Sequence, residues 1–203
     1  ISFNLLHNTG VRTLGHYWYS VPTRTSHKIL GASPLTAMQI RPAFITEAAA
    51  ISALAIRSKA HWGYPEEQMA IFRQELLLPE EQVASKQTHV LIAEGAIAGY
   101  YTLLPHDERT LELEHLFIEP TKLHQGYGSQ LFMHACKVAR KRKFQVLVIQ
   151  SDPNAGGFYR VLGAQLTREI PSSIPGRFIP HFQFDLEQHI GLAINTSRSY
   201  KTT

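Results

Sequence analysis

The feature that most restricts the fold of this chain is the segment LHQGYGSQLF, residues 123–132, where a strand-like run meets a helix-like one. Gly126 and Gly128 stand at that junction. The first N–H groups of a helix have no intrahelical acceptor, and glycine lets a ligand approach them and permits a positive φ. The junction therefore predicts an anion site suited to a diphosphate. The alternative is a tight turn without a ligand.

Two common nucleotide motifs do not fit this segment. A dinucleotide-binding fingerprint needs a third glycine at position 131, where the chain has Leu131. A phosphate-binding loop of the Walker type needs Gly-Lys-Ser or Gly-Lys-Thr, and the chain has Gly-Ser-Gln. A different diphosphate ligand is therefore favoured.

Strand-like and helix-like patterns surround the glycine turn. We expect strands over 38–43, 88–94, 96–104, 110–120, 144–150 and 177–186. Helices are expected over 44–59, from Pro65 to Leu76, after the glycines through Ala139, and over 154–163. This order predicts an α/β (α+β) domain built around one central sheet.

Two sequence blocks resemble the GNAT superfamily of acyl-CoA-dependent N-acyltransferases. The first is LEHLFIEPTKLHQGYGSQLF, similar to the long strand and Q/R-x-x-G-x-G/A turn of that family. The second is DPNAGGFYRVLGA, residues 152–164, similar to its N-x-x-x-x-F-Y-x-x-x-G block. The blocks stand in the family's order, separated by one helix and one buried strand. The resemblance implies a GNAT-like fold, with a central mixed, mostly antiparallel sheet flanked by helices.

The resemblance also implies acetyl-CoA as the acyl donor, with its diphosphate on the glycine turn and its pantetheine arm along the preceding strand. The implied cofactor-binding residues are Leu116, Phe117, Ile118, His124, Gln125, Gly126, Tyr127, Gly128, Ser129 and Asn154. Asn154 is also a candidate helix N-cap. One position departs from the family: Leu123 stands where Gln or Arg is usual, so we expect Gln125 or His124 to supply any side-chain donor.

Acetyl transfer to an amine needs a base, because a lysine-like amine is protonated at neutral pH. Glu112 and Glu114 are two residues apart on the expected strand 110–120, so both lie on one face of a regular strand. The alternative for that face is contact with solvent alone. The resemblance implies Tyr159 as the acid that protonates the departing thiolate; the alternative is a tyrosine that only packs.

The acceptor is predicted to contact His61, Trp62, Tyr64 and Arg177, since the resemblance places SKAHWGYPEE and IPGRFIPHF beside the acceptor site. Arg177 could pair with an acceptor carboxylate. The predicted function is transfer of acetyl from acetyl-CoA to a primary amine of a small molecule or amino acid, by direct attack in a ternary complex. The alternatives are a protein N-terminal or lysine acetyltransferase, and a non-catalytic CoA-sensing module.

Residues 1–37 differ in composition from the rest of the 203-residue chain. Residues 1–37 lack Asp and Glu, and we expect an N-terminal extension there, either disordered, an organellar targeting segment or an upstream reading-frame extension. The predicted GNAT domain is 38–187, followed by a tail, 188–203. Three of the 20 Lys and Arg residues lie in 1–37, which leaves 17 against 16 Asp and Glu. The positive charge therefore gives little support to nucleic-acid binding.

The remaining expectations concern environment and partners. Cys136 is the one cysteine, which excludes an intramolecular disulfide and a cysteine-based zinc site. The 11 histidines lack metal-ligand spacing, so no metal is expected. No run of apolar residues is long enough for a membrane span. We expect a cytoplasmic enzyme without nucleic-acid or membrane partners, with organellar targeting as the alternative; a homodimer is left open.

Overall fold

The computed structural model describes residues 38–187 except 86 and 173. The expectations for 1–37 and 188–203 lie outside the described residues. The strands are β1 (Gln39–Pro42), β2 (Thr88–Ala93), β3 (Ala96–Pro105), β4 (Thr110–Ile118), β5 (Val146–Gln150), β6 (Gln165–Pro171) and β7 (Phe178–Asp185). The α-helices are α1 (Ala48–Ala60), α2 (Glu66–Glu75), α3 (Glu80–Ala84), α4 (Tyr127–Lys141) and α5 (Gly156–Val161).

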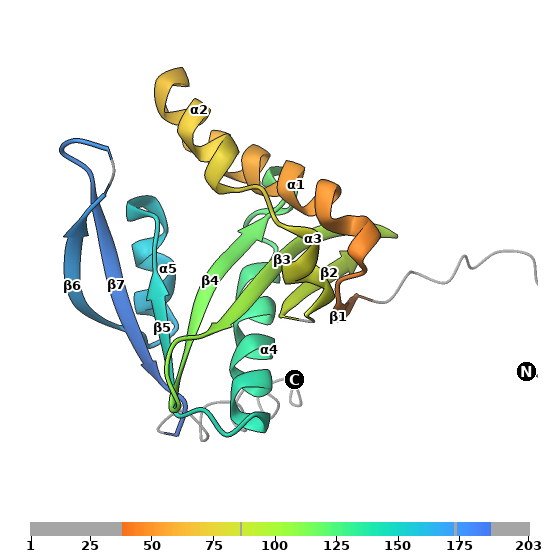
Figure 1. The fold of residues 1–203 in the computed structure, drawn as a ribbon, viewed down its shortest axis with the longest axis vertical. Helices are drawn as coiled ribbons and strands as arrows, with labels where there is room; N and C mark the ends of the chain where they lie inside the picture. Colours follow the sequence, from red (N-terminus) through yellow and green to blue (C-terminus); the bar gives the residue numbers. More distant parts are fainter. Residues whose placement is uncertain (1–37, 86, 173, 188–203) are drawn as a thin grey trace, which may run out of the picture. The chain divides into compact units, whose positions relative to one another are not determined.

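One seven-stranded sheet has the order β1-β2-β3-β4-β5-β7-β6 (Figure 1). The pair β4–β5 is parallel, and the other neighbouring pairs are antiparallel. The parallel pair is joined by a crossover through α4, as a parallel connection requires. This arrangement confirms the predicted α/β class and the mostly antiparallel sheet.

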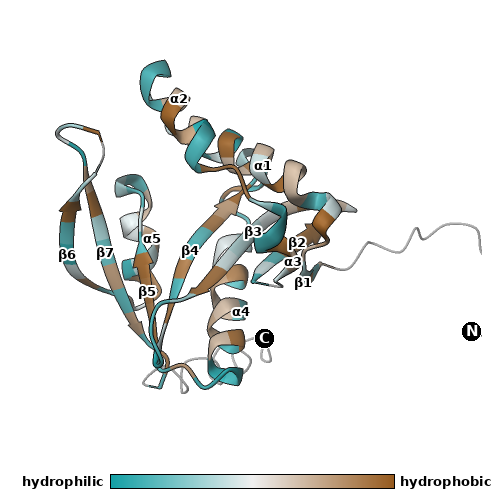
Figure 2. Ribbon diagram, in the orientation of Figure 1, coloured by the Kyte–Doolittle hydropathy of each residue, from teal (hydrophilic) through white to brown (hydrophobic). Residues whose placement is uncertain are grey.

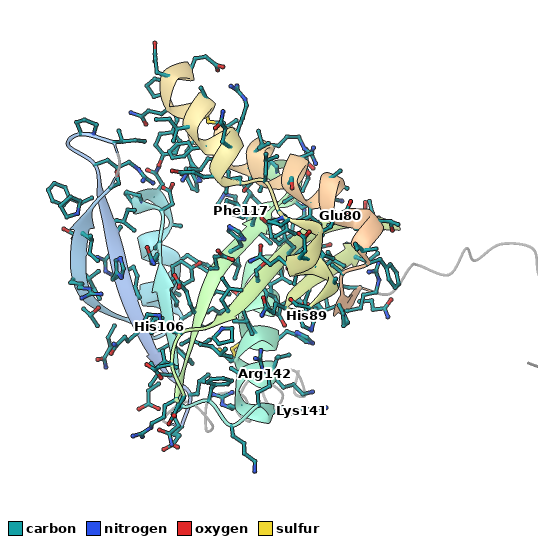
Figure 3. The ribbon with its side chains drawn as sticks, viewed as in Figure 1. Glu80, His89, His106, Phe117, Lys141 and Arg142 are labelled. Atoms are coloured by element: carbon teal, nitrogen blue, oxygen red, sulfur yellow. The ribbon has the colours of Figure 1, made fainter. Side chains whose placement is uncertain are left out.

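The helices cover both faces of the sheet, and each face has its own core. Neighbouring residues of β3 point to opposite faces: Tyr100 packs with α1 and α2, whereas Tyr101 packs with α4. Phe117 of β4, labelled in Figure 3, lies on the first of these faces. Hydrophobic and hydrophilic bands along β4 follow the same alternation (Figure 2).

Helix α4 forms because its apolar residues recur at helical spacing. Leu131, Phe132, Ala135 and Ala139 are buried on one side. Arg140 and Lys141 lie in the last turn, where positive charge is favourable. The helix is therefore held firmly against β3 and β4, and its first turn is fixed relative to the end of β4.

Two elements were not predicted. β6 was missed because most of its residues are exposed and it lacks a buried apolar alternation; its place is set by antiparallel pairing with β7. The short helix α3 was missed because five residues carry too little helical periodicity to be recognised.

Candidate active site

The site begins where β4 and β5 separate. The two strands pair from Thr110↔Val146 to Leu113↔Ile149, and they diverge beyond that point (Figure 1). Within the described residues, the edge of β4 that faces β5 has no strand partner from Glu114 onwards. A free strand edge offers N–H and C=O groups to an extended ligand, which can bind as an added strand.

A β-bulge lies at this separation. Thr102 of β3 is opposite His115, and Leu103 is opposite Leu113, so Glu114 is the extra residue of β4. A bulge redirects the side chains that follow it. Glu114 and the neighbouring His115 both line the cavity described below.

The glycine turn begins α4 next to the free edge. Gly126 has φ +80 and lies just before Tyr127, while His124 has φ 61. A Cβ added to Gly128 would lie 3.2 Å from the Phe158 ring, so glycine here allows α4 to pack closely against α5. The N–H groups of the first helical turn have no intrahelical acceptor and are suited to an anion. The positive φ expected of this turn is found at Gly126.

A cavity of about 720 Å³ joins the free edge, the glycine turn and the two loops predicted to contact the acceptor. Its volume is in the range of small-ligand sites. The predicted residues that line it are Trp62, Glu114, Leu116, Phe117, Ile118, His124, Gly126, Tyr127, Gly128, Ser129, Asn154, Tyr159 and Arg177. The other predicted residues, His61, Tyr64, Glu112 and Gln125, are absent from its lining. Gln125 instead donates from Nε2 to the Thr121 carbonyl oxygen (3.2 Å).

Glu114 has the environment of a base. Its Oε2 accepts a hydrogen bond from Gln82 Nε2 at 2.6 Å. Burial raises the pKa of Glu114 above its ordinary value, and the Gln82 hydrogen bond offsets part of that effect. His115 Nδ1 lies 3.7 Å from the same oxygen, but burial lowers the pKa of His115 to about 4, so its ring is neutral at neutral pH. Glu112 lies outside the cavity lining and accepts from Gln150 Nε2 at 2.8 Å.

Tyr159 lies at the wall of the cavity with 6% of its surface exposed. Its ring packs against Phe132, Phe158 and Phe182, with centroids 5.0 to 6.0 Å apart. Burial raises the pKa of Tyr159 well above its ordinary value. The phenol is therefore protonated at neutral pH and held in a fixed position, as a proton donor requires.

Asp152 is a residue that the sequence analysis missed. It lies two residues after the end of β5, and its carboxylate accepts from Lys59 Nζ at 2.5 Å and from the Tyr64 hydroxyl at 2.8 Å. Its Oδ1 also accepts from the Asn154 N–H at 2.9 Å. Asp152 therefore caps the helical turn that begins at Pro153, and the alternative interpretation of Asn154 as a helix N-cap is not found. An acidic residue before a proline at the first helical position was the signal for this cap.

The Asp152 network joins three segments that are distant in the chain. Lys59 belongs to α1, Tyr64 to the α1–α2 connection, and Arg177 to the β6–β7 connection. Asn154 contributes a bond from Nδ2 to the Tyr64 hydroxyl at 3.0 Å. Although burial would raise the pKa of Asp152, Lys59 and the other donors overcome it and hold the pKa below its ordinary value. Asp152 is therefore ionised at neutral pH.

Lys59 is a second residue that sequence reasoning missed. It is 8% exposed, and its Nζ lies 4.2 Å from the centroid of the Phe72 ring. Burial lowers the pKa of Lys59, and the Asp152 carboxylate opposes that effect. No local sequence signal marks Lys59, because its partners are distant in the chain.

The described residues give two further results. None of the helices among them is long and apolar enough to span a membrane. No group of three or more His, Cys, Asp or Glu side chains in the same residues could hold a metal ion.

The separation of β4 from β5, and the glycine turn that begins α4 beside it, are features of an acyltransferase. The model of the Acetyltransferase (GNAT) family matches residues 50–164. The chain belongs to this family, which confirms the resemblance drawn from the two sequence blocks.

Solved structures share the fold. A GCN5-related N-acetyltransferase from Rhodopseudomonas palustris matches with a TM-score of 0.62 and 20% identity, over 76% of this chain and 99% of that one. The PaiA N-acetyltransferase of Thermoplasma acidophilum, solved in complex with coenzyme A, matches with a TM-score of 0.61 and 18% identity, over 73% of this chain and 99% of that one.

A relative was also found by sequence. The UPF0039 protein C11D3.02c of Schizosaccharomyces pombe is 23% identical over 122 residues, 58% of this chain and 79% of that protein.

Proposed function

We propose that the protein is an N-acetyltransferase that transfers the acetyl group of acetyl-CoA to a primary amine by direct attack in a ternary complex. One observation carries this proposal: a single cavity is lined by the glycine turn, the free edge of β4, a candidate base and a candidate acid. Residues 38–187 are proposed as the catalytic domain.

The cofactor end of the cavity suits the two polar parts of acetyl-CoA. The N–H groups of Tyr127, Gly128 and Ser129 would bind the diphosphate, because they belong to the first turn of α4. The edge of β4 from Leu116 to Ile118 would bind the amide groups of the pantetheine arm as an added strand does. PaiA, which has the same fold, was solved in complex with coenzyme A, and this supports acetyl-CoA as the proposed acyl donor.

Glu114 is the proposed base. It lines the cavity, and a pKa raised by burial brings a carboxylate closer to the pKa that favours proton abstraction near neutral pH. It would take a proton from the ammonium group of the acceptor, directly or through a water molecule, and the neutral amine so formed would attack the acetyl carbon. Glu112 is the alternative base; it would act less directly, because it lies outside the cavity lining and is hydrogen-bonded to Gln150.

Tyr159 is the proposed acid. When the amine nitrogen forms its bond to the acetyl carbon, the carbon–sulfur bond breaks and the thiolate needs a proton. The Tyr159 hydroxyl would supply it. Cys136 is unsuited to a covalent acetyl-enzyme step, because it is buried in α4 outside the cavity lining and burial raises its pKa to about 12.

Two measurements test the proposed function. Isothermal titration calorimetry of the full chain with acetyl-CoA should give saturable one-site binding. A thiol-release assay should then be run over amino acids, polyamines, aminoglycosides and peptides, with mass spectrometry of the products. Transfer to peptides alone would replace the small-molecule acceptor by a protein acceptor. Failure of acetyl-CoA to bind would overturn the whole proposal.

A further inference from the structure

Arg177 has unused hydrogen-bonding capacity at the acceptor end of the cavity. Its side chain is 15% exposed and lines the cavity. Its Nε is buried and has no hydrogen-bond partner among the described residues. Its Nη2 donates to Asp152 Oδ2 at 3.3 Å, which is long for a charge-assisted hydrogen bond. A buried guanidinium with an unpaired N–H is costly unless a ligand completes it.

The carboxylate nearest to Arg177 is already shared. Lys59 Nζ lies 2.5 Å from the same Asp152 oxygen that Arg177 reaches at 3.3 Å. The Tyr64 hydroxyl and the Asn154 N–H also donate to Asp152. Two cations and two neutral donors therefore depend on one carboxylate. Glu75 also lines the cavity, but the ion pairs formed by Lys59 and Arg177 within the described residues are with Asp152.

The guanidinium is oriented by aromatic rings. Its central carbon lies 5.4 Å from the Phe72 ring centroid and 5.8 Å from that of Tyr64. A cation–π contact does not use the N–H groups of a guanidinium, which remain able to bind polar partners. The unpaired Nε–H and an N–H of Nη2 lie along one edge of the Arg177 guanidinium, and this edge matches the two oxygens of a carboxylate.

We propose that the acceptor is a small amine that carries its own carboxylate, such as an amino acid, and that Arg177 binds this carboxylate through its Nε–Nη2 edge. This inference rests on the proposed function and narrows its acceptor class. Trp62 and Phe72 line the same end of the cavity and provide apolar surface for the rest of the acceptor.

The test compares matched acceptors. Each of the 20 L-amino acids and its carboxamide is assayed by thiol release with acetyl-CoA. For the preferred amino acid, kcat/KM should exceed that of its amide by at least about tenfold, the effect typical of a charge-assisted hydrogen bond in a partly buried site. Intrinsic reactivity alone would favour the amides. The α-amine of an amino-acid amide is less basic than that of the free amino acid, so a larger share of it is unprotonated.

Variants then assign the preference to Arg177. In Arg177→Gln, the ratio of kcat/KM for the amino acid to kcat/KM for its amide should fall to about one. Arg177→Lys keeps the positive charge but lacks the planar guanidinium, so this ratio should be reduced but remain above one. The matched control is Arg168→Gln in exposed β6, outside the cavity lining, which should keep the wild-type ratio. Calorimetry with acetyl-CoA and circular dichroism check cofactor binding and folding of each variant.

Each outcome decides the inference. Equal or better transfer to amides in the wild type overturns it and leaves the transferase function intact. An acid preference that persists in Arg177→Gln also overturns it. If Arg177→Gln does not fold, the wild-type preference and its reduction in Arg177→Lys decide in the same way. Absence of acetyl-CoA binding, or of transfer to every amine tested, instead overturns the proposed function and the inference together.

Discussion

The two ends of the cavity differ in the groups that form them: mainly backbone at one end and side chains at the other. The proposed cofactor end uses the backbone of two segments, the free edge at 116–118 and the turn at 126–129. The proposed acceptor end is lined by the side chains of Lys59, Asp152 and Arg177, and Tyr64 bonds Asp152 from outside the lining. A backbone site depends on conformation, and hence on glycine and strand pairing. A side-chain site depends on each residue type and on the packing that brings the residues together.

This difference predicts opposite sensitivities to mutation. The cofactor end should tolerate side-chain truncation and respond strongly to a change at Gly126. The acceptor end should respond to loss of single charged groups. Substitutions at either end can confirm or break this contrast.

Gly126→Val should have the largest effect. Gly126 has φ +80, a conformation that a β-branched residue adopts only with strain, so the turn and its N–H groups would be displaced. We expect the affinity for acetyl-CoA to fall by about 100-fold or more, measured by calorimetry. The control is Gly95→Val, because Gly95 has φ +78, equally open space around a new Cβ, and lies outside the cavity lining. Similar losses of affinity in both variants would refute the special role of the glycine turn.

Tyr159→Phe should lower kcat by about 100-fold, the effect typical of removing a general acid, with little change in acetyl-CoA affinity. The phenyl ring keeps its packing against Phe158, so folding should persist. Steady-state kinetics and calorimetry separate the two quantities. Tyr127→Phe changes a second cavity tyrosine and should leave kcat within about threefold. An unchanged rate in Tyr159→Phe would remove this residue from the mechanism.

Glu114→Gln should lower kcat/KM by about 30-fold, because water or Glu112 replaces the base only in part. In the wild type, kcat/KM should fall as the pH drops below the raised pKa of Glu114, where the carboxylate becomes protonated. Gln82→Leu removes a hydrogen bond that lowers this pKa, so the acidic side of the pH profile should move to higher pH.

Gln150→Leu is the matched control for the base, since Gln150 donates to Glu112 rather than to Glu114. It should leave the acidic side of the profile in place. If the acidic side of the pH profile of kcat/KM shifts in Gln150→Leu and not in Gln82→Leu, Glu112 is the base instead of Glu114.

Asp152→Asn should lower the free energy of unfolding by about 1.5 kcal/mol, because Lys59 and Arg177 would lose their shared partner anion in a partly buried site. Urea denaturation measures this change. Acetyl-CoA affinity should change by less than about threefold if the two ends are as independent as their construction indicates. Asp107→Asn in an exposed turn is the control. A large loss of cofactor affinity in Asp152→Asn would break the contrast between the two ends.

Gln125→Ala should have the smallest effect, less than about twofold on acetyl-CoA affinity. Its side chain bonds the Thr121 carbonyl oxygen and lies outside the cavity lining, so the backbone of the turn would remain. Calorimetry measures the change. A tenfold loss would mean that side chains contribute to anion binding as strongly as the backbone does.

Much of the fold could be predicted from the sequence, because periodic burial makes each element visible locally. Helix α4 and the buried strands β3 and β5 have apolar patterns that fit one secondary structure. Exposed β6 has no such pattern, and its pairing with β7 decides its state. The bulge at Glu114 could not be predicted from the sequence either. A residue of β4 is extra only in relation to the residues of β3 that it pairs with, so the bulge is visible only in the pairing of the two strands.

The sequence by itself determined most of the elements, though not β6 or α3, and the glycine turn at the start of α4, since backbone conformation near glycine and helix periodicity are local properties. Only the tertiary structure decided that Glu114 lines the cavity while Glu112 does not, and that Lys59, Tyr64 and Arg177 meet at Asp152. These contacts join residues 25 to 93 positions apart in the chain. No local pattern encodes them, because they arise only when packing of the sheet and helices brings those segments together.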